Sequence, residues 1–217
     1  MLRAFWGGAV ALAALAANAS ADLTIRINGA DSYGNVGGEF NLTHTNLGFT
    51  PAGLSGSNPF ETFCIEKTES IAFGFDYYAC LNTEAVHGGA GGGDPDPLDS
   101  RTAYLYERFI TGALAGYVYG VGDGGIARGQ AADDLQAVMW YIEEEEPISW
   151  IPGDGSRRDQ FYQDAVNNSG LGIGNVRILN LYEDAAGTIA AQDQLVLIPE
   201  PATMALLALG LVALRRR

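Results

Sequence analysis

The stretch 131–146, AADDLQAVMWYIEEEE, decides the fold class of this chain. Its apolar side chains recur three and four residues apart, which is the spacing of one face of an α-helix. The residues that set this spacing are Leu135, Val138, Met139 and Ile142. Pro147 cannot continue a helix, so we expect the helix to end before it. The middle of the chain is therefore predicted to be helical, with Trp140 buried on the same helix.

Two shorter helices are predicted on either side of this stretch. The segment 101–117 places apolar side chains near one face, and Asp99 or Ser100 could cap its first turn. The segment 156–170 ends on a glycine, a residue that commonly terminates helices. Together with the central helix, these segments predict a helical region of three helices.

Strand-like segments flank the helical region. They combine β-branched and aromatic residues with turns rich in glycine and asparagine. Three of them precede the helices and two follow, at 22–29, 37–49, 60–81, 176–183 and 192–198. The order strands, helices, strands predicts one α+β domain over 22–196, built as a mainly antiparallel sheet with a helical insertion. This length suffices for a single hydrophobic core.

The N-terminal residues 1–21 have the layout of a secretory signal peptide. Arg3 precedes an apolar stretch, and Ala19 and Ala21 occupy the small-residue positions that a signal peptidase recognises. The segment 22–200 carries all 26 acidic residues and 8 of the 12 basic residues, so its net charge is −18. A surface of that charge repels nucleic acid. We therefore expect an exported acidic protein.

The C-terminal residues form three parts in order. Pro199, Glu200 and Pro201 precede the uncharged run 202–214, and Arg215, Arg216 and Arg217 end the chain. Thirteen helical residues span about 20 Å, somewhat less than the roughly 30 Å hydrocarbon core of a bilayer. The arginines resist translocation and favour a cytoplasmic end. The pattern predicts a C-terminal transmembrane helix that holds a precursor in the inner membrane.

These three parts resemble the PEP-CTERM sorting signal of Gram-negative bacteria, over residues 197–217. The resemblance implies a processing enzyme of the exosortase type that recognises the tail. It also implies cleavage near Pro199 to Pro201 and delivery to the cell surface or to the exopolysaccharide matrix of a biofilm. It does not imply what the body of the protein does.

Three short motifs in the body resemble those of bacterial thioester adhesin domains. They are Phe63-Cys64-Ile65-Glu66, Leu135-Gln136 followed by Trp140, and the stretch 191–196. The resemblance implies a thioester between Cys64 and Gln192, supported by Gln136 and Trp140, that captures surface amines. Leu135 stands where that family has threonine. A disulfide between Cys64 and Cys80, or a free Cys64 thiol, is the simpler interpretation of the same residues.

Motifs for metal or cofactor chemistry are sparse. The two histidines, His44 and His87, lack zinc-site spacing, so no metal site and no cofactor are predicted. Weak calcium binding by Asp94, Asp96 and Asp99 is conceivable, although a solvated acidic loop is the simpler interpretation. The acidic run 143–146 is expected to lie in solvent.

The sequence favours a non-enzymatic adhesion or structural module at the cell surface or in the matrix, with exopolysaccharide or surface amines as partners. The alternative is a secreted polysaccharide hydrolase with paired carboxylates.

Overall fold

The computed structural model describes residues 23–30, 38–87, 91–147, 150 and 152–199. The predicted signal peptide with Ala19 and Ala21, and the tail from Glu200 to Arg217 with its predicted transmembrane helix, lie outside these residues. None of the helices in the described part of the chain combines the length and the apolar character that crossing a membrane requires.

Within the described residues, six strands form one antiparallel sheet in the order β3-β2-β1-β4-β7-β8. The strands are β1 (Thr24–Ala30), β2 (Phe40–Thr45), β3 (Phe60–Thr62), β4 (Asp76–Asn82), β7 (Val176–Tyr182) and β8 (Ala190–Leu197). A short second pair joins β5 (Glu84–Ala85) to β6 (Asp96–Pro97). The sheet therefore pairs strands from both sides of the helical region.

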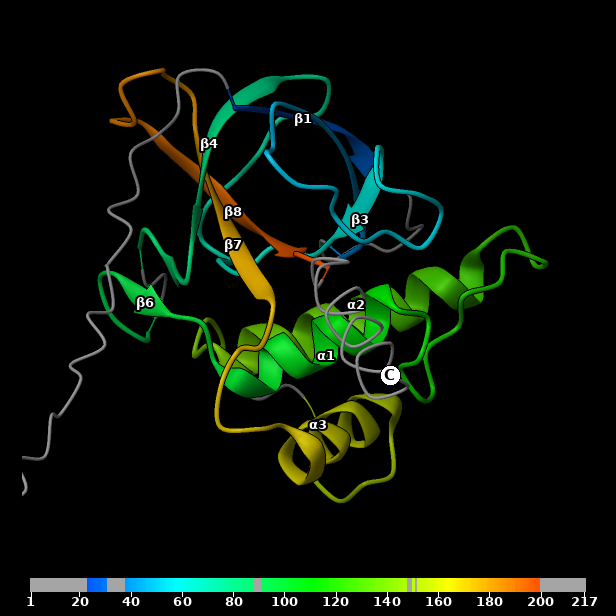
Figure 1. Cartoon of the computed structure of the whole chain (residues 1–217). Coiled ribbons are helices and arrows are strands. Elements are labelled where there is room, and N and C mark those ends of the chain that lie inside the picture. The colour runs from blue at the N-terminus through cyan, green and yellow to red at the C-terminus, as the bar shows by residue number, and fades with distance from the viewer. Residues whose placement is uncertain (1–22, 31–37, 88–90, 148–149, 151, 200–217) are drawn as a thin grey trace, which may run out of the picture.

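The sheet curls until its two edge strands meet (Figure 1). The N–H of Leu195 in β8 donates to the carbonyl of Phe63, just after β3, at 3.0 Å. The N–H of Ile65 donates to the carbonyl of Asp193 at 3.2 Å. In addition, the Thr62 hydroxyl donates to the Leu195 carbonyl at 2.6 Å. These bonds satisfy backbone groups that edge strands would otherwise leave unpaired, so the sheet is closed at this junction.

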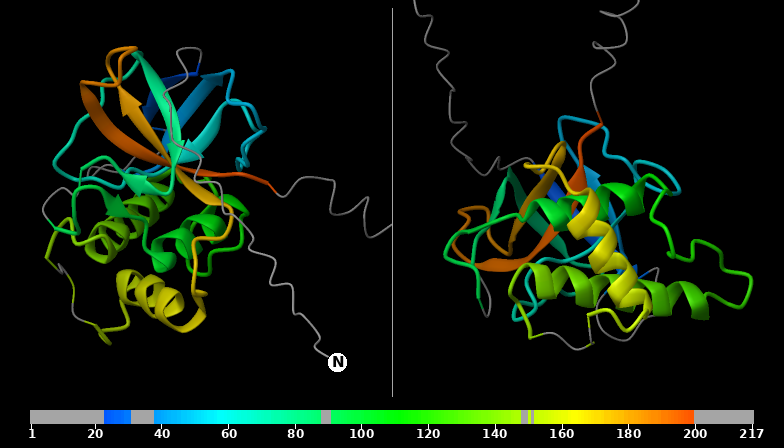
Figure 2. Two further views of the ribbon diagram at one scale, coloured as in Figure 1. Left: turned by 60° about the vertical axis from the view of Figure 1, so that its left-hand side comes forward. Right: turned by 90° about the horizontal axis from the view of Figure 1, so that it is seen from below.

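Three helices form a layer at one end of the closed sheet (Figures 1 and 2). They are α1 (Ser100–Ile110), α2 (Ile126–Ile142) and α3 (Arg157–Asn168). The Asp99 carboxylate accepts the Arg101 N–H and caps α1, as the sequence predicts. Ser156 caps α3 in the same way by accepting the Asp159 N–H.

The helix boundaries differ from the predicted ones. Helix α1 stops at Ile110 rather than near residue 117, because Gly112 adopts a left-handed backbone with φ of +72°. Helix α2 begins at Ile126, five residues before the predicted start. The α+β fold, with a helical insertion between antiparallel strands, is confirmed.

Apolar side chains gather into two clusters. One lies between the helices and the outer face of β7 and β8, and includes Phe109, Leu135 and Leu195. The other fills the inside of the closed sheet, and it includes Cys64 and Trp140. Trp140 is only 5% exposed, so the prediction that it is buried is confirmed. The central helix thus inserts an indole among the side chains of the sheet.

A buried ion pair also ties the sheet to α2. The Glu39 carboxylate, directly before β2, is fully buried and accepts bonds from the Arg128 guanidinium. It accepts a further bond of 2.6 Å from the Tyr117 hydroxyl. Arg128 also donates to the Tyr119 carbonyl at 3.2 Å. The buried carboxylate therefore has a positive partner and additional donors, which is the arrangement that such a charge requires.

Candidate functional site

Cys64 and Gln194 lie directly opposite each other where the sheet closes. They form an isolated antiparallel bridge between the segment after β3 and strand β8. The flanking backbone bonds, from Leu195 to Phe63 and from Ile65 to Asp193, make them a non-hydrogen-bonded pair. In such pairs the Cα atoms are about 4.5 Å apart and the side chains approach most closely. A thiol and a primary amide are thus placed side by side.

Helix α2 supports Cys64 through one glutamine. The Cys64 thiol donates to Gln136 Oε1 at 3.3 Å, and Gln136 Nε2 donates back to the Cys64 carbonyl at 2.8 Å. All three side chains, Cys64, Gln136 and Gln194, are fully buried. The reciprocal bonds hold both the backbone and the thiol of Cys64 in one orientation.

Two polar atoms in this region lack a hydrogen-bond partner. The Gln194 Oε1 atom is buried and unpartnered, although Gln194 Nε2 donates to the Gln192 carbonyl at 3.2 Å. The Trp140 indole N–H is also buried and makes no hydrogen bond of ordinary geometry. Buried polar groups without partners cost free energy and are uncommon in native structures. The Gln194 side-chain oxygen can therefore accept one further hydrogen bond, and the Trp140 indole N–H can donate one.

The Cys64 thiol is held in its neutral form. Burial raises its pKa far above the ordinary value, and the nearby Glu66 and Glu145 carboxylates act in the same direction. The Cys64 backbone and the Trp140 indole lower the pKa, but by less. The thiol is therefore unlike the low-pKa, exposed cysteines that react readily with oxidants.

The structure places Gln194, rather than the predicted partner Gln192, opposite Cys64. The Gln192 amide donates to the carbonyls of Glu66 and Glu69, at 2.7 and 3.1 Å, and the residue opposite Cys64 is Gln194. The two glutamines lie on either side of Asp193, where the pairing of β8 with β7 is irregular between Leu179 and Leu181. Which of the two glutamines faces Cys64 depends on the register in which β8 pairs with the segment after β3.

The disulfide alternative is contradicted, because Cys64 and Cys80 are both free and buried. Cys80 lies on β4, where its thiol is within 3.9 Å of Asn180 Oδ1 and 4.0 Å of the Tyr182 hydroxyl. The partners of Cys80 are therefore on β7, whereas the Cys64 thiol bonds to Gln136 of α2.

A pair of carboxyls lies next to the junction. Glu66 Oε2 accepts the Asp193 N–H at 3.0 Å, and Glu66 Oε1 accepts the His87 N–H at 3.2 Å. Asp193 accepts bonds from Asn180 Nδ2 and from the N–H groups of Leu181 and Val86. Burial raises the pKa of both carboxyls, and in Glu66 the Asp193 charge adds to the effect. Since both carboxyls are fully buried, they cannot flank a polysaccharide in this state.

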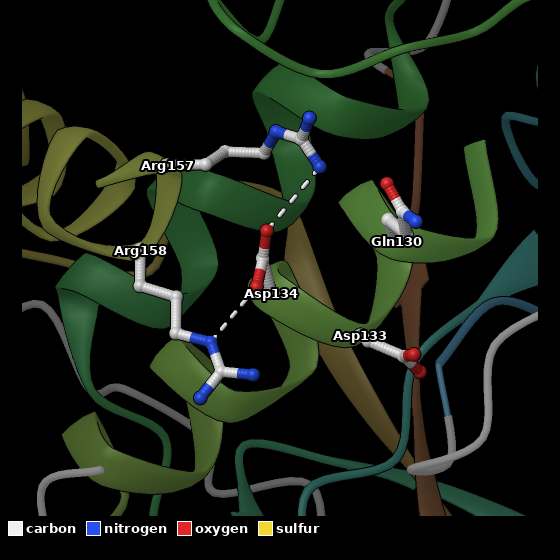
Figure 3. A pocket seen from close by; sticks show the side chains of 5 residues that line it. All are labelled: Gln130, Asp133, Asp134, Arg157 and Arg158. Carbon is white, nitrogen blue, oxygen red and sulfur yellow. Dashed lines mark hydrogen bonds and ion pairs between the residues drawn. The ribbon is translucent and has the colours of Figure 1, made fainter. Parts of the chain in front are cut away.

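A polar hollow of about 400 Å³ lies on the helical layer, lined by Gln130, Asp133, Asp134, Arg157 and Arg158. Figure 3 shows Asp134 held between Arg157 and Arg158, with Asp133 pointing away. The Asp134 oxygens accept from Arg157 at 3.2 Å and from Arg158 at 2.8 Å. This carboxylate is therefore occupied by ion pairs and does not form an acid and base pair with Asp133.

The residues considered for metal binding do not converge. Among the described residues, no group of three or more histidine, cysteine, aspartate or glutamate side chains is placed to hold a metal ion. Asp99 caps α1 and pairs with Arg101, Asp96 is buried in β6, and Asp94 is exposed next to His87. The structure does not assemble a calcium site from the three aspartates.

The acidic run after α2 departs from its prediction. Glu143 and Glu145 are buried rather than solvated. Glu143 accepts the Asp99 N–H, and Glu145 accepts the Lys67 N–H at 3.0 Å. These carboxylates are occupied in holding the segments that precede α1 and follow Cys64. Four consecutive glutamates predict solvent exposure. The sequence pattern does not show that two of them accept hydrogen bonds from backbone N–H groups of distant segments.

The comparisons with known proteins add information on the end of the chain. A family model described as the PEP-CTERM protein-sorting motif matches residues 197–217. The chain carries a PEP-CTERM sorting motif. The motif begins at Leu197, the last residue of β8, and its exposed Pro199 is the last described residue. A PEP-CTERM motif indicates an exported protein that an exosortase processes at the membrane. Comparison with curated proteins and with solved structures found no match.

Proposed function

We propose that this protein is a surface or matrix adhesion module that captures amines covalently through a thioester between Cys64 and Gln194. The observation that supports it best is the placement of these two buried side chains as a directly opposed, non-hydrogen-bonded pair. The sorting motif supplies the cellular setting, because a protein delivered to the outside of a cell meets amine-bearing surfaces there.

Formation of the thioester needs only the groups that are present. The Cys64 sulfur attacks Cδ of Gln194, a C–S bond forms, and the C–N bond of the amide breaks. The amide nitrogen leaves as ammonia and takes the thiol proton. Gln136 Oε1 orients that proton, and the unpartnered Trp140 N–H is a donor available to the oxyanion that develops on the carbonyl.

Capture of an amine opens the thioester. A primary amine attacks the same carbonyl carbon, the C–S bond breaks, and a proton passes from the amine nitrogen to the Cys64 sulfur. The product is a secondary amide between Gln194 and the partner, with Cys64 restored as a thiol. Burial protects the bond from water until the amine arrives, which is the purpose of an enclosed reactive site.

The hydrolase alternative is not proposed. Glycosidases need two carboxyl groups on either side of a substrate-accessible cleft. Among the described residues, the closely interacting Glu66 and Asp193 are fully buried, and Asp134 is held by two arginines. Neither arrangement offers an acid and a base to an external polysaccharide.

Intact mass spectrometry of the exported protein from its native cell tests the proposal. The body is expected to weigh one ammonia less than its sequence and to gain one methylamine when that amine is added. Both properties should disappear in Cys64→Ala and Gln194→Ala and persist in Gln192→Ala, the matched control on the same strand. A Gln194→Ala protein that still lacks one ammonia would refute the assignment.

The sorting role has a separate test. Deletion of residues 199–217 is expected to release the body to the medium or leave it in the periplasm, because the motif that the exosortase recognises is gone. Fractionation of cells that carry the truncated chain measures this. Unchanged localisation would contradict a sorting function for the tail.

A further inference from the structure

The side chain of Lys67 occupies a small ammonium-binding seat next to the candidate site. Its ammonium group lies 5.4 Å from the centre of the Trp140 ring and forms an ion pair with Glu146. An aromatic face together with a carboxylate is a favourable environment for a cation. We call the Trp140 ring and the Glu146 carboxylate the ammonium seat.

The ammonium seat adjoins the Cys64 thiol. Gln136 and Trp140 are one helical turn apart on α2. Gln136 accepts a hydrogen bond from the Cys64 thiol, and Trp140 lies in the same buried cluster as Cys64, where its indole lowers the pKa of the thiol. The same indole contacts the Lys67 ammonium through its ring. One side chain therefore links the seat to the thiol.

The Lys67 side chain that fills the seat reaches solvent, whereas the Cys64 thiol does not. The Lys67 side chain is 41% exposed and that of Glu146 is 15% exposed, while Cys64 is fully buried. The Lys67 backbone is fixed, because its N–H donates to buried Glu145. Only the lysine side chain needs to move for another ammonium group to enter.

The lysine content of the chain bears on the role of Lys67. Lys67 is the only lysine among its 217 residues. A protein that captures amines would react with its own lysines if they reached the site. In this chain the single lysine lies at the site itself, with its ammonium group held by a carboxylate and an aromatic ring.

On the basis of the proposed function, we propose that Lys67 is a latch. Its ammonium group fills the seat formed by Trp140 and Glu146, and a cationic primary amine must displace it before reaching the Cys64–Gln194 bond. The incoming ammonium first loses one proton to Glu146 or to water. The neutral amine then attacks the Gln194 carbonyl carbon, and its second proton goes to the departing sulfur.

The test uses the exported protein with Lys67→Met, which empties the seat, and Lys67→Arg, which keeps a cation there but removes the reactive amine. The rate of methylamine incorporation is followed by intact mass spectrometry, and melting curves check that both variants are folded. Lys67→Met is expected to react roughly 5- to 30-fold faster than the parent, the range given by losing one cation–π contact and one ion pair. Lys67→Arg is expected to react at about the parental rate.

The other outcomes overturn the latch in distinguishable ways. Equal rates for Lys67→Met and the parent would show that Lys67 does not control access. A methylamine-reactive bond in both variants but not in the parent would show that Lys67 itself is joined to Gln194. If neither the parent nor any variant lacks an ammonia, the proposed function fails and the latch fails with it.

Discussion

Replacement of Arg128 by Met is expected to destabilise the body far more than the loss of an ordinary ion pair. Glu39 is fully buried, and Arg128 is its cationic partner through Nε at 3.0 Å and through a second guanidinium nitrogen. Without Arg128, the charge retains the hydrogen bond from Tyr117. Removing one partner of a buried pair typically costs about 3–5 kcal/mol, a large part of the roughly 5–15 kcal/mol that stabilises a domain.

Urea denaturation of the exported body measures this cost, and the chain offers a matched control. Arg26 and Asp76 form a pair with similar chemistry, but their side chains are 48% and 62% exposed. Arg26→Met should cost only about 0–1 kcal/mol. The double variant Arg128→Met with Glu39→Gln should recover part of the loss, because no buried charge remains. If Arg128→Met costs no more than Arg26→Met, the buried pair does not hold the sheet to α2.

Three further predictions concern stability. Trp140→Ala should cost about 3–5 kcal/mol, because it empties the indole's position inside the sheet, and a chemical denaturation curve like that of the parent would show that the packing is wrong. Burial raises the pKa of Glu143 from 4.5 to about 8, so the folded state binds the extra proton between these pH values and loses stability as the pH rises through them. Melting temperatures at pH 5 and pH 8 should therefore differ less in Glu143→Gln than in the parent; an unchanged difference would remove Glu143 as a cause. Asp99→Ala should cost about 0.5–2 kcal/mol through loss of the α1 cap, and unaltered stability in urea would argue against that cap.

Local patterns predicted the three helices, whereas the strand-like segment 60–81 divides into β3 and β4 with no strand at residues 63–75. The spacing of Leu135, Val138 and Met139 identified α2, and Asp99 was recognised as a possible cap, because both features depend on residues within a few positions of each other. The start of α2 was missed, since Gly125, Gly129 and several alanines carry no apolar periodicity. Boundaries set by glycine conformation are visible only once the backbone is known.

The candidate site shows what local patterns cannot supply. The residues 191–195, AQDQL, contain two glutamines, and nothing within the segment shows which of them faces Cys64. The register across the closure does so, and it depends on bonds between residues some 130 positions apart. The buried glutamates at 143 and 145 were missed for the same reason, because their partners are backbone groups of distant segments.

The position of Gln194 on the last strand has a mechanical consequence. Strand β8 ends at Leu197, where the sorting motif begins. If a partner is bonded to Gln194 and the chain is retained through its C-terminal segment, tension between the two passes along only a few residues at the end of β8. The strands that precede β8 and the three helices that the structure describes lie outside that path. Shear would then act on the pairing of this short stretch, and most of the domain would remain folded while the attachment carries force.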